Sequence, residues 1–288
     1  MNNLEKSREI NLLLLKRFRE VCDKHHITWF IDGGTLLGGA RHQGFIPWDD
    51  DVDVIMDPVN YAKLLKIPDD EWGADFEIAR YSDNTTYFKD FITRLYYTGA
   101  SMEVKSRFAE GAVKFGDQMD LEQHHLGLDV FVMENTYDQM FLHRFVFIPK
   151  LYMLYGLAAG HRREMDRNEN QYGVMKKWVL VMLMKVGKHF SLERIYGMLK
   201  KMLAKKRGVQ HCCTAHAPFP YVKKLHKWEW FAGSVDIPFC DETFPAPVGY
   251  REYLANIYGD YLAFPPEDKR VPEHLVNPYA EYAEQQES

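Results

Sequence analysis

Two short segments near the N-terminus hold the residues whose types and spacing could carry out chemistry. Residues 31–35 (IDGGT) place a glycine pair directly after an apolar stretch. Residues 49–53 (DDDVD) place four carboxylates within five positions. Glycines let a backbone approach a phosphate closely, and clustered carboxylates repel one another unless a cation lies between them. Together the two segments predict a phosphate-binding turn beside a metal-binding strand.

The carboxylates are spaced so that three of them share one side of a strand. Alternate residues of a β-strand point the same way, so Asp49, Asp51 and Asp53 face one side. Val52 and Val54 then face the core. Because Asp51 and Asp53 lie about 7 Å apart along the backbone, one divalent ion can bridge them. Mg²⁺ prefers one or two carboxylates completed by substrate phosphates and water, so we predict Mg²⁺ at Asp51 and Asp53.

A third acid is expected from another strand. Asp129 is the single acid within the apolar residues 126–133, where an unpaired charge is costly to bury. We therefore predict Asp129 as the third catalytic carboxylate and metal ligand. Two plainer interpretations stay open, in which residues 49–53 form a solvated acidic loop and Asp129 pairs with an arginine. The glycine turn upstream favours the metal site.

Several residues near the glycine turn could bind the phosphates of a nucleotide. Gly33 and Gly34 would allow a diphosphate to approach, and Thr35 could donate a hydrogen bond to it. Arg41 and His42 follow one helix later and are predicted to bind the diphosphate or the leaving phosphate. The alternative for this last pair is an ordinary place on the surface.

Helices and strands must position these side chains, and apolar spacing predicts where they lie. We expect helices over residues 3–26, 35–41, 57–65 and 249–258. We expect strands over residues 27–31, 51–56, 76–79, 88–97 and 126–133. Thr35 and Asp57 should cap their helices, and Lys89 and Arg94 should lie on a strand that lines the same cleft. The proline-rich residues 218–247 are predicted to form loops. The alternation of helices and strands predicts the α/β fold class with a mixed sheet.

Composition excludes several classes of protein. The 288 residues are 46% hydrophobic and 27% charged, which is typical of a globular chain with a sizeable core. A net charge of −5 and a pI near 6.2 argue against a nucleic-acid partner. The four cysteines do not have the spacing of a disulfide scaffold. We expect no signal peptide from the first residues and no membrane span, because no apolar run is long enough to cross a bilayer. We therefore expect a cytoplasmic protein.

Residues 138–207 differ from the rest of the chain in charge. From Arg144 to Arg207 there are 15 Lys and Arg but only four acids, so the remainder is strongly acidic. Composition predicts helices here, and the apolar residues 178–184 are long enough to lie in an interface. We interpret this region as a helical basic insert that faces an anionic membrane or the acceptor, at the inner face of the cell membrane. A solvated helical face and an oligomer interface are the alternatives.

These motifs resemble the LicD family of phosphocholine transferases, which is related to the fukutin-type ribitol-phosphate transferases. The resemblance includes both ends of the chain but assigns no motif to residues 138–207. It rests on residues 31–38, 41–54 and 127–131, and near the C-terminus on residues 250–254 and 258–261, Pro265, Pro266 and His274.

The resemblance implies a nucleotidyltransferase-type mixed β-sheet flanked by helices, in one domain over residues 1–288 with an insert at 138–207. It also implies two Mg²⁺ ions, held at Asp51, Asp53 and Asp129. The implied reaction moves phosphocholine, or a similar phospho-alcohol, from CDP-choline or another CDP-alcohol to a hydroxyl of a cell-surface glycan. Such an acceptor would be a lipopolysaccharide or teichoic acid, which can be lipid-linked, and CMP would be released. Choline, ribitol and glycerol donors stay open.

Two other classes of protein stay open. A nucleotidyltransferase of the aminoglycoside-modifying type would release pyrophosphate from ATP, although residues 41–53 disfavour it. A glycan-binding or scaffold protein without activity should have lost one of the metal-binding acids. Because Asp51, Asp53 and Asp129 are all present, an enzyme is favoured.

Overall fold

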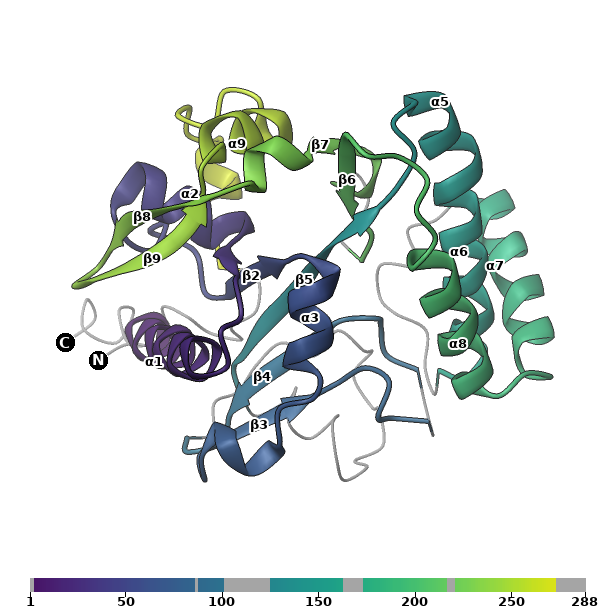
Figure 1. Cartoon of the computed structure of the whole chain (residues 1–288), viewed down its shortest axis with the longest axis horizontal. Coiled ribbons are helices and arrows are strands. Elements are labelled where there is room, and N and C mark those ends of the chain that lie inside the picture. The colour runs from purple at the N-terminus through teal and green to yellow at the C-terminus, as the bar shows by residue number, and fades with distance from the viewer. Residues whose placement is uncertain (1–2, 86–87, 101–124, 163–172, 217–220, 273–288) are drawn as a thin grey trace.

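A mixed β-sheet forms the centre of the molecule (Figure 1). The computed structural model describes residues 3–85, 88–100, 125–162, 173–216 and 221–272. The strands of the sheet are β1 (Phe30–Ile31), β2 (Val52–Met56), β3 (Phe76–Ala79), β4 (Thr93–Tyr97), β5 (Gly127–Asn135), β6 (His211–Thr214) and β7 (His226–Lys227). Their order is β1-β2-β5-β4-β3, and β6 pairs with β5 and with β7. The predicted α/β class with a mixed sheet is confirmed.

The central strands set the position of the predicted acids. Strands β2 and β5 are parallel, whereas β4 runs antiparallel to β5. In this register the Cα of Asp53 is opposite that of Asp129, and Asp129 is in turn opposite Arg94. Since directly opposed residues of neighbouring strands point to the same face, these three side chains form a row across β2, β5 and β4.

The other face of the same strands packs into the main core. Val52, Val54, Leu128 and Val130 are buried in one cluster with the apolar side of helix α1 (Asn3–Lys24). The predicted alternation along β2 is therefore confirmed, with valines on the core face and Asp53 on the opposite one. Asp50 is buried, and its backbone carbonyl accepts a hydrogen bond from Asn11 of α1 at 2.9 Å.

Two predicted helix starts have different outcomes. Helix α3 (Pro58–Leu64) begins as expected, because the Asp57 carboxylate accepts hydrogen bonds from the backbone N–H groups of Val59 and Asn60. Helix α2 (Gly33–His42) does not begin at Thr35, so that prediction is wrong. The Thr35 hydroxyl instead accepts a hydrogen bond from the Asp53 N–H at 2.9 Å.

Two predicted strands are shorter than expected. Residues 27–31 contribute only the two residues of β1, and residues 88–97 contribute only β4. Residues 88–92 leave the sheet because Phe88 and Phe91 are buried in a second cluster with the helical insert. This departure also places Asp90 against Arg94.

The proline-rich return contains strands that the sequence interpretation missed. Strand β8 (Ser234–Phe239) pairs antiparallel with β9 (Glu242–Pro247), so the prediction of loops here is wrong. Prolines are tolerated because both strands of a two-stranded sheet are edge strands. Ile237, Phe239 and Phe244 are buried in the main core, which attaches the hairpin to the sheet.

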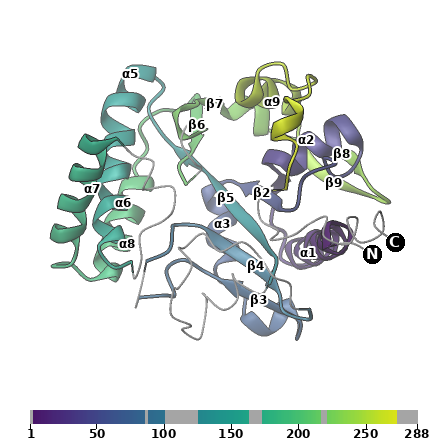
Figure 2. The same ribbon diagram turned by 180° about the vertical axis from the view of Figure 1, so that it is seen from behind.

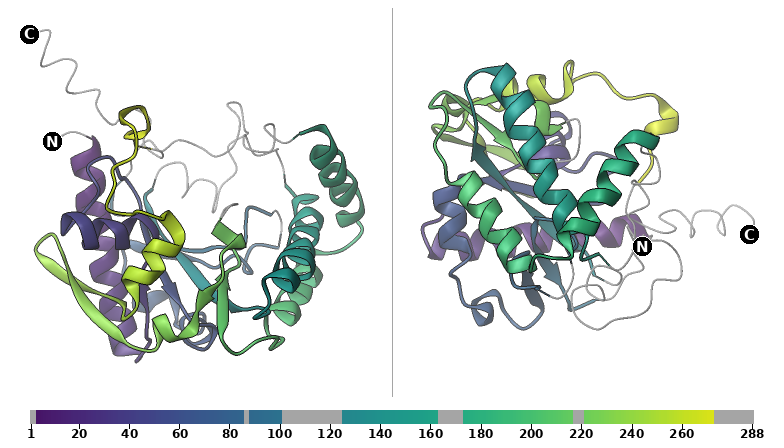
Figure 3. Two further views of the ribbon diagram at one scale, coloured as in Figure 1. Left: turned by 90° about the horizontal axis from the view of Figure 1, so that it is seen from above. Right: turned by 90° about the vertical axis from the view of Figure 1, so that its right-hand side faces the viewer.

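Residues 138–207 are helical in their described part, as predicted. They form α5 (Met140–Leu142), a π-helical turn (His143–Phe147), α6 (Ile148–Ala159), α7 (Val174–Gly187) and α8 (Leu192–Leu203). These helices lie at the opposite side of the sheet from α1 and α2 (Figure 2), and α6 lies between α7 and α8 (Figure 3, right). Among the described residues, no helix combines the length and the apolar character needed to cross a membrane.

Helix α9 (Tyr250–Tyr258) follows the β8–β9 hairpin and matches the helix predicted over residues 249–258. It lies beside α2, on the same side of the molecule (Figure 1). Buried Tyr253 and Leu254 join the main core.

All four cysteines lie in the described part of the chain and are free, in agreement with the absence of a disulfide scaffold.

Candidate active site

The glycine pair packs directly against the acidic strand. The backbone N–H of Asp32 donates to the Asp53 carbonyl at 2.9 Å, and the Thr35 hydroxyl accepts from the Asp53 N–H. These bonds hold the start of α2 against the start of β2. A Cβ atom on Gly33 would lie 2.7 Å from Asp53 Oδ2, and one on Gly34 would lie 2.6 Å from Asp49 Oδ2. No other residue type fits at either position without moving a carboxylate.

Gly33 has a second reason to be glycine, because its φ of +54° lies in the left-handed region. We expect Gly33→Ala to lower the free energy of unfolding by about 2 kcal/mol, from backbone strain and the contact with Asp53. The displaced Asp53 carboxylate should also reduce activity. Urea unfolding followed by circular dichroism measures the loss of stability.

The control for this substitution is Gly197→Ala in α8, where a Cβ meets nothing within 4 Å. Alanine within a helix should be more stable than glycine there by about 0.5–1 kcal/mol. We therefore expect the free energy of unfolding to fall in Gly33→Ala and to rise in Gly197→Ala. A similar loss of stability in both variants would contradict the close approach of Gly33 to Asp53.

Five carboxylates gather where the glycine turn meets β2. Asp53 is half-buried and stands beside Asp129 on the neighbouring strand. Burial, and then the charges of Asp51, Asp129, Asp32 and Asp49, raise the pKa of Asp53 well above its ordinary value. The side chains predicted at this site are therefore brought together, and their combined negative charge favours a bound cation.

Arg94 is the counter-charge of this row. Its Nε donates to Asp129 Oδ1 at 2.6 Å, and its Nη2 donates to Asp129 Oδ2 at 3.1 Å. The other side of the guanidinium binds both carboxylate oxygens of Asp90 at 3.0 Å. Burial lowers the pKa of Arg94, but the Asp129 and Asp90 carboxylates outweigh it and raise that pKa well above its usual value. Asp129 thus both faces the acidic site and pairs with an arginine.

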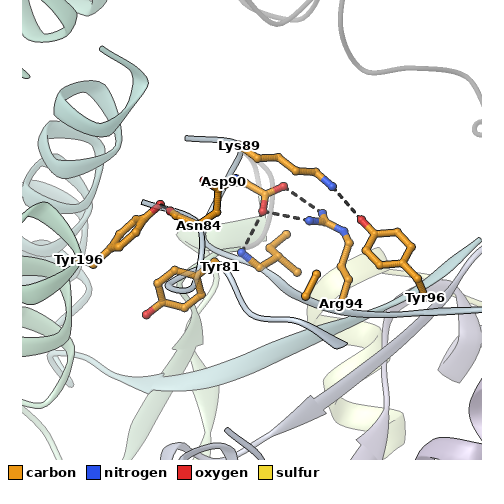
Figure 4. A pocket seen from close by; sticks show the side chains of 9 residues that line it. Tyr81, Asn84, Lys89, Asp90, Arg94, Tyr96 and Tyr196 are labelled. Atoms are coloured by element: carbon orange, nitrogen blue, oxygen red, sulfur yellow. Dashed lines mark hydrogen bonds and ion pairs between the residues drawn. The ribbon is translucent and has the colours of Figure 1, made fainter. Parts of the chain in front are cut away.

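Lys89 and Arg94 line one pocket, but the predicted metal-binding acids are not among its lining residues, and the prediction that Lys89 lies on a strand is wrong. The Lys89 ammonium donates to the Tyr96 hydroxyl at 2.9 Å, and Asp90 and Tyr196 complete the wall (Figure 4). Lys89 comes from the irregular residues before β4, whereas Arg94 is on the strand itself.

The donor set suits a metal site that the substrate completes. In the described ranges, no three His, Cys, Asp or Glu side chains are placed to hold a metal ion by themselves. Asp51 and Asp53 nevertheless offer hard carboxylate oxygens at the start of β2, and burial followed by the neighbouring charges, Asp51 first among them, raises the pKa of Asp53. Mg²⁺ binds at sites where one or two carboxylates are joined by substrate phosphates, so these residues fit Mg²⁺ in a complex with a diphosphate.

Arg41 and His42 lie at the end of α2, whereas the glycine pair begins it. The Arg41 guanidinium donates to the carbonyls of Tyr261 and Ala263 at 3.0 and 3.1 Å, and it lies 4.8 Å from the centre of the Phe264 ring. Arg41 Nε also donates to His42 Nε2 at 3.0 Å. These contacts attach the segment after α9 to α2, and binding of phosphate by this pair stays a prediction.

Comparisons with known proteins identify the family of this chain. Residues 26–153 match the family described as LicD/FKTN/FKRP, nucleotidyltransferase domain. The chain carries a LicD-family domain. The matched range contains β1, β2, β4 and β5, and with them the glycine pair and all three predicted metal-binding acids. The resemblance to the LicD family is confirmed.

Relatives of the LicD-family domain include a protein that matches almost end to end. The lipopolysaccharide cholinephosphotransferase LicD of Haemophilus influenzae is 26% identical over 290 residues, which cover 96% of this chain and 97% of that protein. Uncharacterized proteins of Rickettsia typhi and Rickettsia prowazekii match shorter stretches. The first is 46% identical over 55 residues, 18% of each chain, and the second is 51% identical over 41 residues, 14% of this chain and 15% of that protein.

One hydrogen bond in the LicD-family site was not predicted. The Tyr253 hydroxyl of α9 donates to Asp32 Oδ1 at 2.7 Å, and both side chains are buried. Burial raises the pKa of Asp32 to about 6, although this hydrogen bond opposes the shift. Asp32 is a lone acid after an apolar stretch, which is the same signal that selected Asp129. His274, the last residue of the resemblance, lies outside the described residues.

Proposed function

We propose that this LicD-family protein transfers phosphocholine, or a similar phospho-alcohol, from a CDP-activated donor to a hydroxyl of a cell-surface glycan and releases CMP. The placement of Asp51, Asp53 and Asp129 beside the Gly33–Gly34 turn carries this proposal. The Haemophilus influenzae relative is named a lipopolysaccharide cholinephosphotransferase, which supports phosphocholine as the group and a lipopolysaccharide-type acceptor.

The acids and the glycine turn have distinct proposed roles. Asp51 and Asp53 would hold Mg²⁺, with Asp129 as the third ligand, and the Gly33–Gly34 backbone would admit the donor diphosphate. When bound, Mg²⁺ neutralises charge on the diphosphate and lowers the pKa of the attacking hydroxyl. The superfamily resemblance implies two such ions.

The proposed reaction is a displacement at phosphorus. The acceptor hydroxyl oxygen attacks the phosphorus that bears the alcohol, and the bond from that phosphorus to the bridging oxygen breaks. CMP leaves with the bridging oxygen, and the hydroxyl proton passes to Asp129 as general base. Both Asp129 oxygens accept from Arg94, which fixes the carboxylate in place. Each carboxylate oxygen has a second lone pair for the proton.

Product analysis tests this proposal. The purified chain is incubated with Mg²⁺, a lipopolysaccharide acceptor and, in separate reactions, CDP-choline, CDP-ribitol, CDP-glycerol or ATP. We expect CMP from one CDP-alcohol, no pyrophosphate from ATP, and loss of the CMP signal with EDTA. Pyrophosphate release would instead favour the aminoglycoside-modifying type of nucleotidyltransferase. Asp51→Ala retaining more than a small fraction of the activity would contradict the metal role.

A further inference from the structure

Helix α7 carries large apolar side chains on its solvent face. The exposed fractions of Met175, Trp178 and Met182 are 82%, 70% and 45%. With Val179 and Val186, which are also exposed, these residues follow the i, i+3, i+4, i+7 and i+11 spacing of a single helix face. They therefore form a continuous apolar stripe along the helix.

The stripe is not the face that α7 packs against its neighbours. Leu180, Leu183 and Met184 have the same spacing on the other side of the helix and pack into the core that α6 shares with α8. Nothing in the described part of the chain covers the outer stripe, since its residues are among the most exposed apolar side chains. Contiguous exposed apolar surface of this kind marks an interaction site.

Charge around the stripe indicates what covers it. Helix α7 contains no Asp or Glu, and its three lysines, Lys176, Lys177 and Lys185, are exposed, as is Lys188 directly after the helix. Burial, and then the nearby charges of Arg144 and Lys176, lower the pKa of Lys223. Three elements thus contribute basic groups at one edge of α7, which is complementary to an anionic surface.

A second copy of the chain fits this face less well. In a two-fold dimer the same surface meets itself, so the lysines of one copy would lie opposite the lysines of the other. An anionic lipid surface instead satisfies both features, since it accepts apolar side chains below its headgroups and lysines among them. With 14 residues, α7 is about 21 Å long, shorter than the roughly 30 Å hydrocarbon core, so it would lie in the plane of the bilayer.

We propose that α7 binds flat to an anionic lipid bilayer, with Met175, Trp178 and Met182 below the headgroups and the lysines among them. This binding surface belongs to α7, and α6 lies between α7 and the sheet (Figure 1). It would place the protein where a lipid-linked acceptor is presented, and only that last consequence rests on the proposed function.

Vesicle sedimentation tests the proposal without any measurement of activity. We expect the full chain to pellet with vesicles of phosphatidylcholine and phosphatidylglycerol but not with phosphatidylcholine alone. The variant Trp178→Glu, Met182→Glu should lose more than about tenfold in partitioning. Lys176→Gln, Lys177→Gln should lose about fivefold for each lysine removed, and high salt should act in the same direction.

Matched variants show whether the loss of binding is specific to the α7 surface. Val59→Glu in α3 removes an apolar side chain that is 69% exposed and lies outside the insert, and it should pellet like the original chain. Asp53→Asn should also pellet normally, so a failure of the proposed reaction does not affect this result. Thermal unfolding confirms that each variant is folded.

Depth of insertion is tested with brominated lipids, which quench tryptophan fluorescence on contact. We expect quenching in anionic vesicles, and its loss in Trp178→Phe. Equal pelleting with neutral and anionic vesicles, or none with either, would overturn the proposal. A chain that is dimeric in solution, becomes monomeric in Trp178→Glu, Met182→Glu and never pellets would assign the face to a second copy.

Discussion

Asp53→Asn is expected to lower the rate of phospho-alcohol transfer by about a thousandfold or more while leaving the protein folded. A metal ligand in such a site contributes several kcal/mol to the transition state, and each 1.36 kcal/mol is about tenfold in rate. Asparagine keeps the size of the side chain but removes the charge that would bind the cation. The rate of CMP release, measured with saturating donor and Mg²⁺, checks the loss.

The same substitution should stabilise the protein in the absence of metal. Burial and four neighbouring carboxylates raise the pKa of Asp53, so its charged form opposes folding. The folded protein therefore binds this proton more tightly than the unfolded chain, and stability falls as pH rises above about 4. We expect Asp53→Asn to gain about 1 kcal/mol at neutral pH in EDTA, and nothing in acid below the unfolded pKa.

The control is Asp236→Asn on β8, an exposed acid away from the site. It should leave both the rate and the stability close to those of the original chain. Added Mg²⁺ should raise the unfolding temperature of the original chain and of this control but not of Asp53→Asn. A rate for Asp53→Asn within a few-fold of the original would remove Asp53 from the metal site.

Arg94→Met is expected to lower the free energy of unfolding by about 3 kcal/mol. The substitution keeps much of the volume but leaves the carboxylates of Asp90 and Asp129 without their cation, and removing one member of a buried ion pair costs about 3–5 kcal/mol. We place the value at the lower end because Asp129 remains partly exposed. Urea unfolding measures the change.

Two further variants make the Arg94 prediction specific. Lys227→Met breaks an ion pair with Glu229 in which both side chains are exposed, and it should cost less than about 1 kcal/mol. Asp90→Asn combined with Arg94→Met should cost less than the sum of the two single changes, because the pair is removed together. Arg94→Met should also reduce transfer by releasing Asp129. A stability loss no larger than that of Lys227→Met would show that the ion pair contributes little.

Short-range patterns of residues selected the acids and the glycine pair that the fold brings together. The alternation of Val52 and Asp53 and the lone acid Asp129 were sufficient to place two carboxylates on strands, because side-chain direction in a strand depends only on local geometry. Asp51 was also expected on the strand, but it lies one residue before β2. Helix caps also depend on local geometry, and Asp57 caps α3 as expected. The glycine pair was also correctly placed beside the acids, although the helix begins at Gly33 and not at Thr35.

Contacts between distant segments depend on the three-dimensional fold. Arg94 meets Asp129 because β4 pairs with β5, and Tyr253 meets Asp32 across 221 positions of the chain. Arg41 likewise binds the carbonyls of residues 261 and 263 because the fold brings the segment after α9 against the end of α2.

Local sequence patterns were enough to propose residues for a metal and a diphosphate, and to predict that residues 138–207 are helical and basic. The packing of the folded chain was needed to show that Arg94 neutralises Asp129 and that the apolar stripe of α7 faces outward. Composition and periodicity are properties of neighbouring residues, whereas strand order and helix packing bring together residues that no local pattern relates.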